Sequence, residues 1–364
     1  FNDICLFKCA TNMSKIDKYF DILIEKGGSD LHLAEGQPAK IRVHGEIAAI
    51  GDETLDRVTL NDMMEEICEA KRYQNYLKTG DIDFAYALGN RARFRANYYM
   101  QADGLGCIFR IIPSEILSLE KLKSPEVLKR FAHFKSGLVL VTGPTGSGKS
   151  TTLAAIIDYI NTNQAKHILT IEEPIEFVHP IKKSVIIQRE VGVDTLSFSD
   201  GLKSSTRQDL DIVLVGEMRD PETIALALTA AEMGSLVFGT LHTNSAAKTI
   251  DRIVDSFPAE EQENVLMLLG NSLRGICSQL LLKTADGKGR CAVQEILVEA
   301  EGLSNMIRER KIAMLESLIQ QGKKEGMQLM DDALWEKMEA KVIAPEDAYM
   351  KAKDKKRFES LLKS

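Results

Sequence analysis

The sequence predicts an α/β fold, in which a parallel sheet has helices on both faces and follows a smaller α+β domain. After residue 136, runs of consecutive apolar residues alternate with helical segments, a pattern typical of strands buried on both faces. A glycine-rich phosphate-binding motif lies directly between the first run and a helix. Before residue 113, short alternating strands accompany helices instead. The four buried runs are Gly137–Thr142, His167–Ile171, Ile212–Val215 and Leu236–Thr240.

The composition indicates a soluble globular protein of about two domains. The chain has 364 residues, 44% of them apolar, and a formal net charge of −7. This acidic balance argues against a protein that binds nucleic acid, and we expect no nucleic-acid partner. No apolar run approaches the ~18 residues of a membrane span, and no signal peptide is recognised. We therefore expect a cytoplasmic protein.

Residues 14–112 are predicted to form the N-terminal domain. Met13 resembles a natural start, so residues 1–12 are interpreted as an upstream extension or an expression remnant, and residues 1–13 are left outside the domain. Ser14 is expected to cap a first helix that ends at Gly27-Gly28. The residue before Pro113 is biased away from helix, which predicts a linker over residues 113–117. The other expected elements are a helix around Leu60–Leu77 and strands at 40–44, 83–88 and 91–99.

Residues 118–364 are predicted to form the second domain, which becomes helical from about residue 300. One helix is well delimited, because Asp220 can cap it, Pro221 suits its first position and Gly234 can stop it. The six cysteines include no CxxC pair, so we expect no structural zinc. A last strand is expected after about Arg290, followed by helices at Leu303–Glu309, Ile312–Gln321 and Asp331–Lys341.

The motif Gly143–Ser150 fits GxxxxGK[ST], and its place between a strand and a helix predicts an ATP site. Glycines let backbone N–H groups turn inward around phosphate at a positive helix N-terminus. Lys149 is expected to reach the β- and γ-phosphates, and Ser150 to ligate Mg²⁺. The predicted nucleotide-binding residues are Gly143, Pro144, Thr145, Gly146, Ser147, Gly148, Lys149, Ser150 and Thr151.

Hydrolysis also needs groups that orient water and support the metal, and three candidates follow predicted strands. Glu172 and Glu217 each end a buried run, and His242 follows another. The carboxyl ends of parallel strands share the edge where ligands bind, so these side chains are expected to lie near the phosphate loop. The alternative for each acid is an ordinary loop carboxylate, and for His242 a structural histidine.

Alternating arginines form a basic face on a predicted strand of the first domain. Arg91, Arg93 and Arg95 alternate with small and aromatic residues, so their guanidiniums share one face. Three interpretations remain open: a solvated face, a nucleic-acid contact, or arginines supplied to the γ-phosphate of a neighbouring subunit. Arg110 is a second, isolated candidate.

The order of these motifs resembles the PilT-like type IV pilus retraction ATPases, which belong to the secretion-motor ATPases. The resemblance covers residues 14–362. Segments similar to motifs of that family are Gly27–Leu33 (N-terminal signature), Arg93–Arg95 with Phe109-Arg110 (arginine segment), Gly143–Ser150 (Walker A), Thr170–Phe177 (Asp box), Asp211–Asp220 (Walker B) and Gly239–Ser245 (His box).

The resemblance implies a PAS-like N-terminal domain, a RecA-like motor domain and a hexameric ring that hydrolyses ATP to power pilus retraction and twitching motility. It implies that Arg93, Arg95 and Arg110 contact nucleotide, partly across the subunit boundary. Glu172 and Glu217 become the candidates for activating water and organising Mg²⁺, with Glu217 acting on the metal directly or through water. The implied partners are an inner-membrane platform protein and other pilus motor ATPases, at the cytoplasmic face of the inner membrane.

Three departures from the family pattern are visible. Glu173 stands where the Asp box has aspartate, and Leu210 where proline is usual. The retraction motif Ala-Ile-Arg-Asn-Leu-Ile-Arg-Glu corresponds to Gly302–Glu309, which lacks the Ala-Ile-Arg triplet. An alternative is therefore an accessory paralogue that binds ATP and acts with a second retraction motor. A DNA-translocating P-loop ring is a further alternative, which the acidic charge disfavours.

Overall fold

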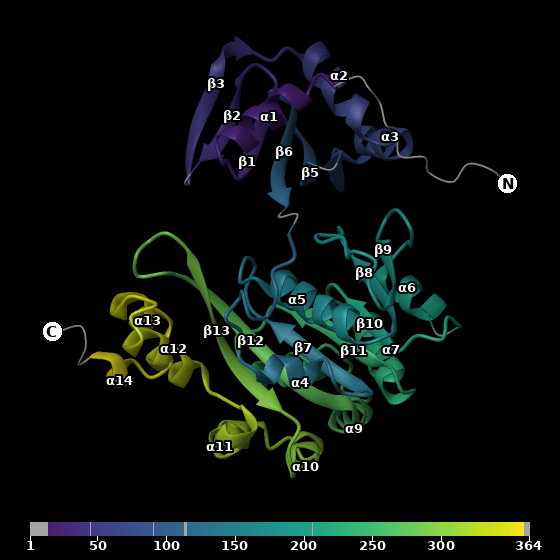
Figure 1. Cartoon of the computed structure of the whole chain (residues 1–364). Coiled ribbons are helices and arrows are strands. Elements are labelled where there is room, and N and C mark those ends of the chain that lie inside the picture. The colour runs from purple at the N-terminus through teal and green to yellow at the C-terminus, as the bar shows by residue number, and fades with distance from the viewer. Residues whose placement is uncertain (1–13, 44, 90, 113–114, 206, 360–364) are drawn as a thin grey trace. The chain divides into compact units, whose positions relative to one another are not determined.

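The computed structural model describes residues 14–43, 45–89, 91–112, 115–205 and 207–359 (Figure 1). The predictions for residues 1–13 and for the first part of the linker, 113–114, lie outside these ranges. The chain divides into two compact units. The first extends to Glu115 and includes Pro174–Phe177, and the second holds Ile116–Glu173 and Val178–Ser364. Each unit is described separately below.

In its described residues, the first unit is an antiparallel six-stranded sheet with three helices. Its strand order is β3-β2-β1-β6-β5-β4, and every neighbouring pair is antiparallel. Its core is rich in aromatic rings, with Phe20 stacked on Phe94 and edge-on to Phe109. The elements are α1 (Asp17–Glu25), β1 (Asp30–Ala34), β2 (Pro38–Val43), β3 (Glu46–Thr54), α2 (Arg57–Ile67), α3 (Ala70–Thr79), β4 (Asp81–Leu88), β5 (Ala92–Gln101) and β6 (Gly104–Ile112).

Two details of the first unit differ from the sequence prediction. The single helix expected around Leu60–Leu77 is two helices, because the backbone is extended at Cys68, where α2 ends. Ser14 does not cap α1, whose N-cap residue is Ile16. Instead, the Ser14 backbone N–H and hydroxyl donate to the Asp17 carboxylate at 3.0 and 2.6 Å. The Asp17 carboxylate thus holds the chain that precedes α1, and no side chain among the described residues caps the first turn of this helix.

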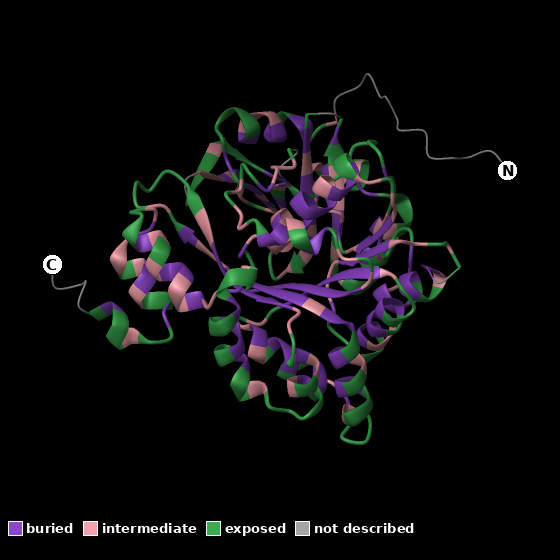
Figure 2. Ribbon diagram, turned by 60° about the horizontal axis from the view of Figure 1, so that its bottom comes forward, coloured by how far each residue is buried: buried purple, intermediate pink, exposed green. Residues whose placement is uncertain are grey.

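The second unit is built on a seven-stranded sheet in the order β13-β12-β7-β11-β10-β8-β9. All neighbours are parallel except the β12–β13 pair. The parallel sheet and its four predicted strands are confirmed, whereas β9 and β12 had not been predicted. Figure 2 shows buried positions running along these strands. The strands are β7 (Gly137–Thr142), β8 (His167–Glu172), β9 (Val185–Glu190), β10 (Ile212–Val215), β11 (Leu236–Leu241), β12 (Leu273–Lys283) and β13 (Arg290–Val298).

The helices of the second unit for which the sequence predicts ends start and stop close to those ends, whereas α4, α6, α8, α9, α13 and α14 had no predicted bounds. Asp220 caps α7 by accepting the Thr223 N–H at 2.8 Å, and Gly234 follows the helix with φ +111°. The expected helix Ile312–Gln321 is a 3₁₀ turn followed by α11. The helices are α4 (Val127–Phe131), α5 (Lys149–Asn163), α6 (Phe198–Ser205), α7 (Pro221–Glu232), α8 (Ala246–Asp255), α9 (Gln262–Ser272), α10 (Leu303–Arg308), α11 (Leu315–Gln321), α12 (Met330–Glu339), α13 (Pro345–Lys351) and α14 (Lys355–Glu359).

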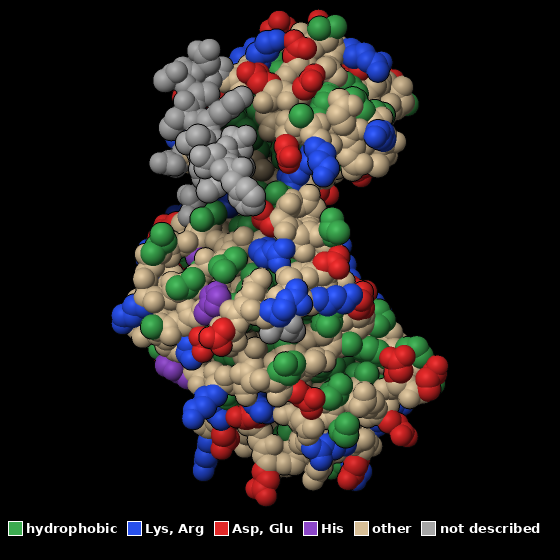
Figure 3. Space-filling model, turned by 90° about the vertical axis from the view of Figure 1, so that its right-hand side faces the viewer, with side chains coloured by type: hydrophobic (Ala, Val, Ile, Leu, Met, Phe, Trp, Pro, Cys, Tyr) green, Lys and Arg blue, Asp and Glu red, His purple; other side chains and the backbone are tan. Residues whose placement is uncertain are grey.

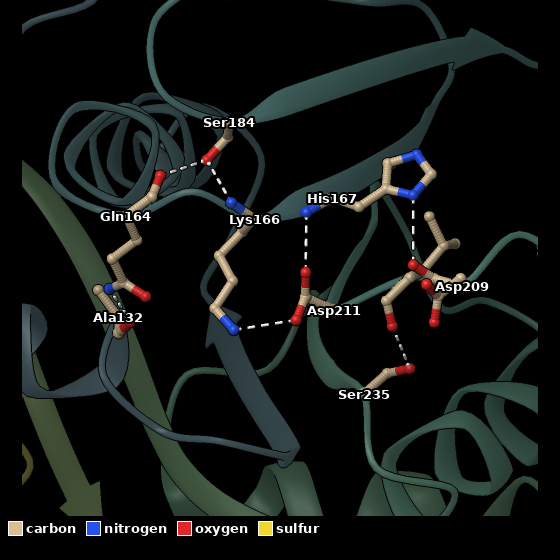
Figure 4. Close-up of polar contacts among 9 residues, drawn as sticks. Ala132, Gln164, Lys166, His167, Ser184, Asp209, Asp211 and Ser235 are labelled. Carbon is tan, nitrogen blue, oxygen red and sulfur yellow. Dashed lines mark hydrogen bonds and ion pairs between the residues drawn. The ribbon is translucent and has the colours of Figure 1, made fainter.

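Asp211 ties the amino ends of β8 and β10 together (Figure 4). Its carboxylate accepts the Lys166 ammonium and the His167 backbone N–H, both at 2.9 Å. These donors outweigh the burial that would raise the pKa of Asp211, and the net result is a lowered pKa. Asp211 therefore lies at the end of β10 opposite to Glu217, although the two belong to the same sequence motif.

Candidate active site

The phosphate loop connects the end of β7 to the start of α5. Gly143, Gly146 and Gly148 adopt φ angles of +146°, +78° and +85°, which side chains on L-residues disfavour. The Lys149 ammonium donates to the carbonyls of Gly143 and Pro144 at 2.9 and 3.2 Å. The loop thus has the glycine conformations and the helix N-terminus that an anion site requires.

Glu217 is bound by two nitrogen-bearing side chains. Arg219 makes a bidentate contact with it, from Nε at 2.6 Å and Nη2 at 2.7 Å. His242 Nε2 lies 3.0 Å from Glu217 Oε1, and because an ionised carboxylate only accepts, this nitrogen carries the hydrogen. Burial raises the pKa of Glu217, but Arg219 and His242 outweigh it, so the pKa is lowered.

Glu172 lies at the end of β8, the strand next to β10. Its Oε1 accepts the Thr170 hydroxyl at 2.7 Å and the Gln188 amide at 3.3 Å. The adjacent Glu173 lies 3.6 Å from Arg219, which therefore bridges Glu173 and Glu217. Sequence reasoning missed Arg219, although its place two residues after Glu217 was a usable signal.

The strand order brings these groups to one sheet edge. The neighbours β7, β11, β10 and β8 end respectively at the phosphate loop, His242, Glu217 and Glu172. The expected side-by-side arrangement along the edge follows directly from this order. Within the described residues, no group of three or more His, Cys, Asp or Glu side chains is placed to hold a metal by itself.

A polar layer supplied by β12 and β13 supports the loop, and the sequence analysis missed it. Ser278 Oγ lies 2.8 Å from Thr142 Oγ1 at the end of β7. Gln279 Nε2 donates to the Ser147 carbonyl at 2.6 Å, and its Oε1 accepts the Thr152 hydroxyl at 2.8 Å. Polar residues in an unpredicted strand left no recognisable pattern, so no sequence signal marked them.

The arginine candidates all lie in the first unit. Arg93 and Arg95 are in β5, where they alternate with buried apolar residues as predicted, whereas Arg91 precedes the strand. Arg110, in β6, is directly opposite Arg95. Each has an acidic neighbour that offsets this like-charge pairing: Arg110 Nε donates to the buried Asp30 at 2.8 Å, and Arg95 lies 3.6 Å from Asp83.

Most of the chain matches one known protein family. A family model described as type II/IV secretion system protein matches residues 14–347. The chain belongs to this family. Among described residues, none of the helices is both long and apolar enough to cross a bilayer.

Several relatives in the type II/IV secretion family are similar over most of the chain. A twitching motility protein of Neisseria gonorrhoeae is 52% identical, over 86% of this chain and 84% of its own length. The type IV pilus retraction ATPase PilT of Pseudomonas aeruginosa is 50% identical, covering 92% and 97%. The type IV pilus ATPase PilU of the same species is 37% identical, covering 92% and 87%.

Solved structures support the same assignment. The pilus retraction motor PilT, crystallised with bound ADP, is 42% identical and superposes with a TM-score of 0.87, covering 95% of this chain and 99% of its own. The ATPase DotB of Legionella pneumophila is 29% identical with a TM-score of 0.77. The chain is therefore a secretion-type ATPase of the pilus-retraction group, as its motifs predicted.

Proposed function

We propose that this chain is the ring-forming ATPase that powers type IV pilus retraction at the cytoplasmic face of the inner membrane. The second unit is the RecA-like motor, and the first unit is PAS-like. The observation that carries the proposal is the sheet edge where the phosphate loop, His242, Glu217 and Glu172 follow one another on neighbouring strands. Similarity to retraction ATPases over most of the chain supports it.

In the proposed reaction, ATP binds to residues 143–151, and Lys149 offsets charge on the β- and γ-phosphates. Arg219 and His242 lower the pKa of Glu217, and a carboxylate with a lowered pKa is a weak base. We therefore assign to Glu172 the alignment of the attacking water. Ser150 and Glu217 would hold Mg²⁺, because a hydroxyl and a carboxylate are oxygen ligands of the kind that Mg²⁺ prefers. When bound, the metal would supply positive charge beside the phosphates.

The proposed oligomer is a hexamer in which Arg93, Arg95 and Arg110 act on nucleotide held by a neighbouring copy. Exposed apolar side chains support an association surface on the side of the second unit that carries β9, where Figure 3 shows green groups among charged ones. Exposed apolar groups gathered in one region mark contact with another molecule. They are Val178, Ile181, Val185, Ile187, Val193 and Leu196, with Ile181 99% and Leu196 87% exposed.

Replacement of each acid by its amide tests the assigned roles. Glu172→Gln should lower kcat by about 100-fold or more and leave nucleotide binding intact, because a water-aligning group acts in the transition state. The measurement is steady-state phosphate release together with ADP affinity. Glu217→Gln should raise the Mg²⁺ concentration required for half-maximal rate. Full turnover in Glu172→Gln would refute its assignment.

The accessory role remains a second candidate because of the altered segment at residues 302–309. Gly302 has φ +86° at the N-cap of α10, a conformation that an alanine, as in the retraction motif, would strain. An alanine at this position would therefore require a different local backbone. Restored twitching in a retraction-null strain that expresses this chain alone would support an independent motor. Restoration that requires a second pilus ATPase would support the accessory role.

A further inference from the structure

Two buried glutamines face each other across β12 and β13 beside the phosphate loop. Gln279 and Gln294 are register partners, with exposures of 2% and 3%. Gln279 Oε1 accepts the Gln294 amide at 2.8 Å as well as the Thr152 hydroxyl. With its oxygen used twice, Gln279 directs its Nε2 hydrogen to the Ser147 carbonyl at 2.6 Å.

The direction of these bonds determines the direction of a backbone peptide. In a planar trans peptide, the carbonyl of one residue and the N–H of the next point opposite ways. Because Gln279 binds the Ser147 carbonyl, the Gly148 N–H of the same peptide points away from β12. A flipped peptide would turn a carbonyl oxygen toward the phosphates and repel them.

We propose that Gln279 is a positioning residue, which holds the Ser147–Gly148 peptide so that its N–H faces the nucleotide phosphates. Gln294 fixes the orientation of the Gln279 amide, because a flipped Gln279 would set two donors against each other and two acceptors against each other. The inference rests on the proposed nucleotide site at this loop. In this role, β12 and β13 hold the phosphate loop in its binding conformation before nucleotide binds.

The loop glycines fit this close support. A Cβ on Gly143 would lie 2.2 Å from the Gln279 carbonyl oxygen, and one on Gly148 would lie 2.9 Å from Gln279 Nε2. Both glycines therefore allow the backbone and side chain of Gln279 to approach the loop, in addition to providing positive φ angles. Without this approach the bond to Ser147 could not form.

A carboxyl group at position 279, titrated between pH 6 and 8, distinguishes a hydrogen-bonding role of Gln279 from simple packing. Gln279→Glu replaces the donor by a carboxylate against the Ser147 carbonyl. At pH 8 we expect about tenfold weaker binding of N-methylanthraniloyl-ADP, the scale of one lost hydrogen bond to an anion site. At pH 6, protonation of the buried carboxyl supplies an O–H donor, and affinity should partly recover. Gln279→Leu should bind weakly at both pH values.

A matched control lies beside β13, where Gln328 forms an isolated bridge with Ile296. Gln328 donates to the backbone carbonyl of Gln294 at 2.7 Å, without an observed bond to the loop, and Gln328→Leu should bind ADP as the wild type does. Thermal unfolding without nucleotide confirms that each variant is folded. If the Gln279 variants do not fold, Gln294→Leu decides, with weaker ADP binding supporting the proposal and unchanged binding overturning it.

Wild-type ADP affinity in folded Gln279→Glu and Gln279→Leu would overturn the inference. ADP binding by Lys149→Ala, measured in parallel, distinguishes failure of the positioning role from failure of the proposed nucleotide site. If Lys149→Ala loses ADP binding while the Gln279 variants retain it, the positioning role alone fails. If Lys149→Ala also binds ADP normally, the proposed nucleotide site itself fails.

Discussion

Arg219 sets the charge of the site at the scale of single residues. It holds Glu217 in a bidentate ion pair and also reaches Glu173, while His242 donates to the same Glu217. Four side chains that follow β8, β10 and β11 are thereby connected. A nucleotide that draws Arg219 or His242 away would change the charge environment of Glu217 directly.

Removal of Arg219 should change the pH dependence of turnover. The lowered pKa keeps Glu217 ionised well below neutral pH in the wild type. In Arg219→Ala, burial of Glu217 is less opposed, so the pKa of this carboxyl rises and the acid-side fall in kcat should move to higher pH. The measurement is kcat between pH 5 and 8. Lys203→Ala, which breaks an exposed ion pair with Glu222, is the control, and identical acid limbs in Arg219→Ala and wild type would contradict this account.

At the scale of elements, one buried acid connects two helix starts to β13. Glu295 is 8% exposed, and its carboxylate accepts the Ala246 N–H of α8 at 2.8 Å and the Met330 N–H of α12 at 3.4 Å. Burial raises the pKa of Glu295, and the two N–H donors oppose this only in part. The helix that follows the His242 loop is thus joined to the C-terminal helices.

Glu295→Gln should remove a pH dependence of stability. In the folded state the pKa of Glu295 is raised above its ordinary value of about 4.3, so the folded state binds this proton up to a higher pH than the unfolded state does. The wild-type free energy of unfolding therefore falls as the pH rises from the unfolded-state pKa to the folded-state pKa. The free energy of unfolding of the wild type should therefore rise relative to that of Glu295→Gln as the pH falls. Urea unfolding between pH 4.5 and 8 measures it, with the exposed Glu301→Gln as control. Parallel curves for wild type and Glu295→Gln would contradict the prediction.

The predictable elements are those whose residues serve only burial or local capping. β7 and β10 are continuous apolar runs, and α7 has its cap, proline and glycine in order, so all three follow from the sequence. β12 was missed because Ser278 and Gln279 break its apolar run to support the phosphate loop. The break between α2 and α3 depends on the extended backbone at Cys68, which no breaker residue marks.

The part of the candidate site that could be predicted is the set of side chains that directly follow the strands. Glu172, Glu217 and His242 each follow an apolar run, so the parallel sheet alone predicts that they share an edge. Their bonding partners were not predictable, because contacts such as Arg219–Glu217 and Gln279–Ser147 depend on side-chain directions and on strand pairing distant in sequence.

At the scale of the whole molecule, the chain divides its chemistry between two units. The phosphate loop and the strand-end acids belong to the second unit, whereas Arg93, Arg95 and Arg110 belong to the first. In the proposed ring, each nucleotide receives arginines from a neighbouring copy. Rotation between units would then couple hydrolysis to movement of a membrane platform protein.

Mixed rings test whether the arginines act between copies. Lys149→Ala subunits lack a competent loop but keep their arginines, and an Arg93→Ala,Arg95→Ala double variant has the reverse defect. Mixing the two inactive proteins should restore part of the ATPase activity, because some interfaces then combine an intact loop with intact arginines. The measurement is phosphate release against mixing ratio. No recovery at any ratio, in rings confirmed to be mixed, would show that the arginines do not act in trans.

Phosphate release by the purified full chain, compared with its Lys149→Ala variant, tests the central claim most directly. The account predicts Mg²⁺-dependent ATP turnover in the wild type and its loss, together with weakened ADP binding, in the variant. Both proteins should assemble to the same size, so that the loss reflects the loop alone. Equal turnover in the two proteins would show that hydrolysis occurs elsewhere and would contradict the account.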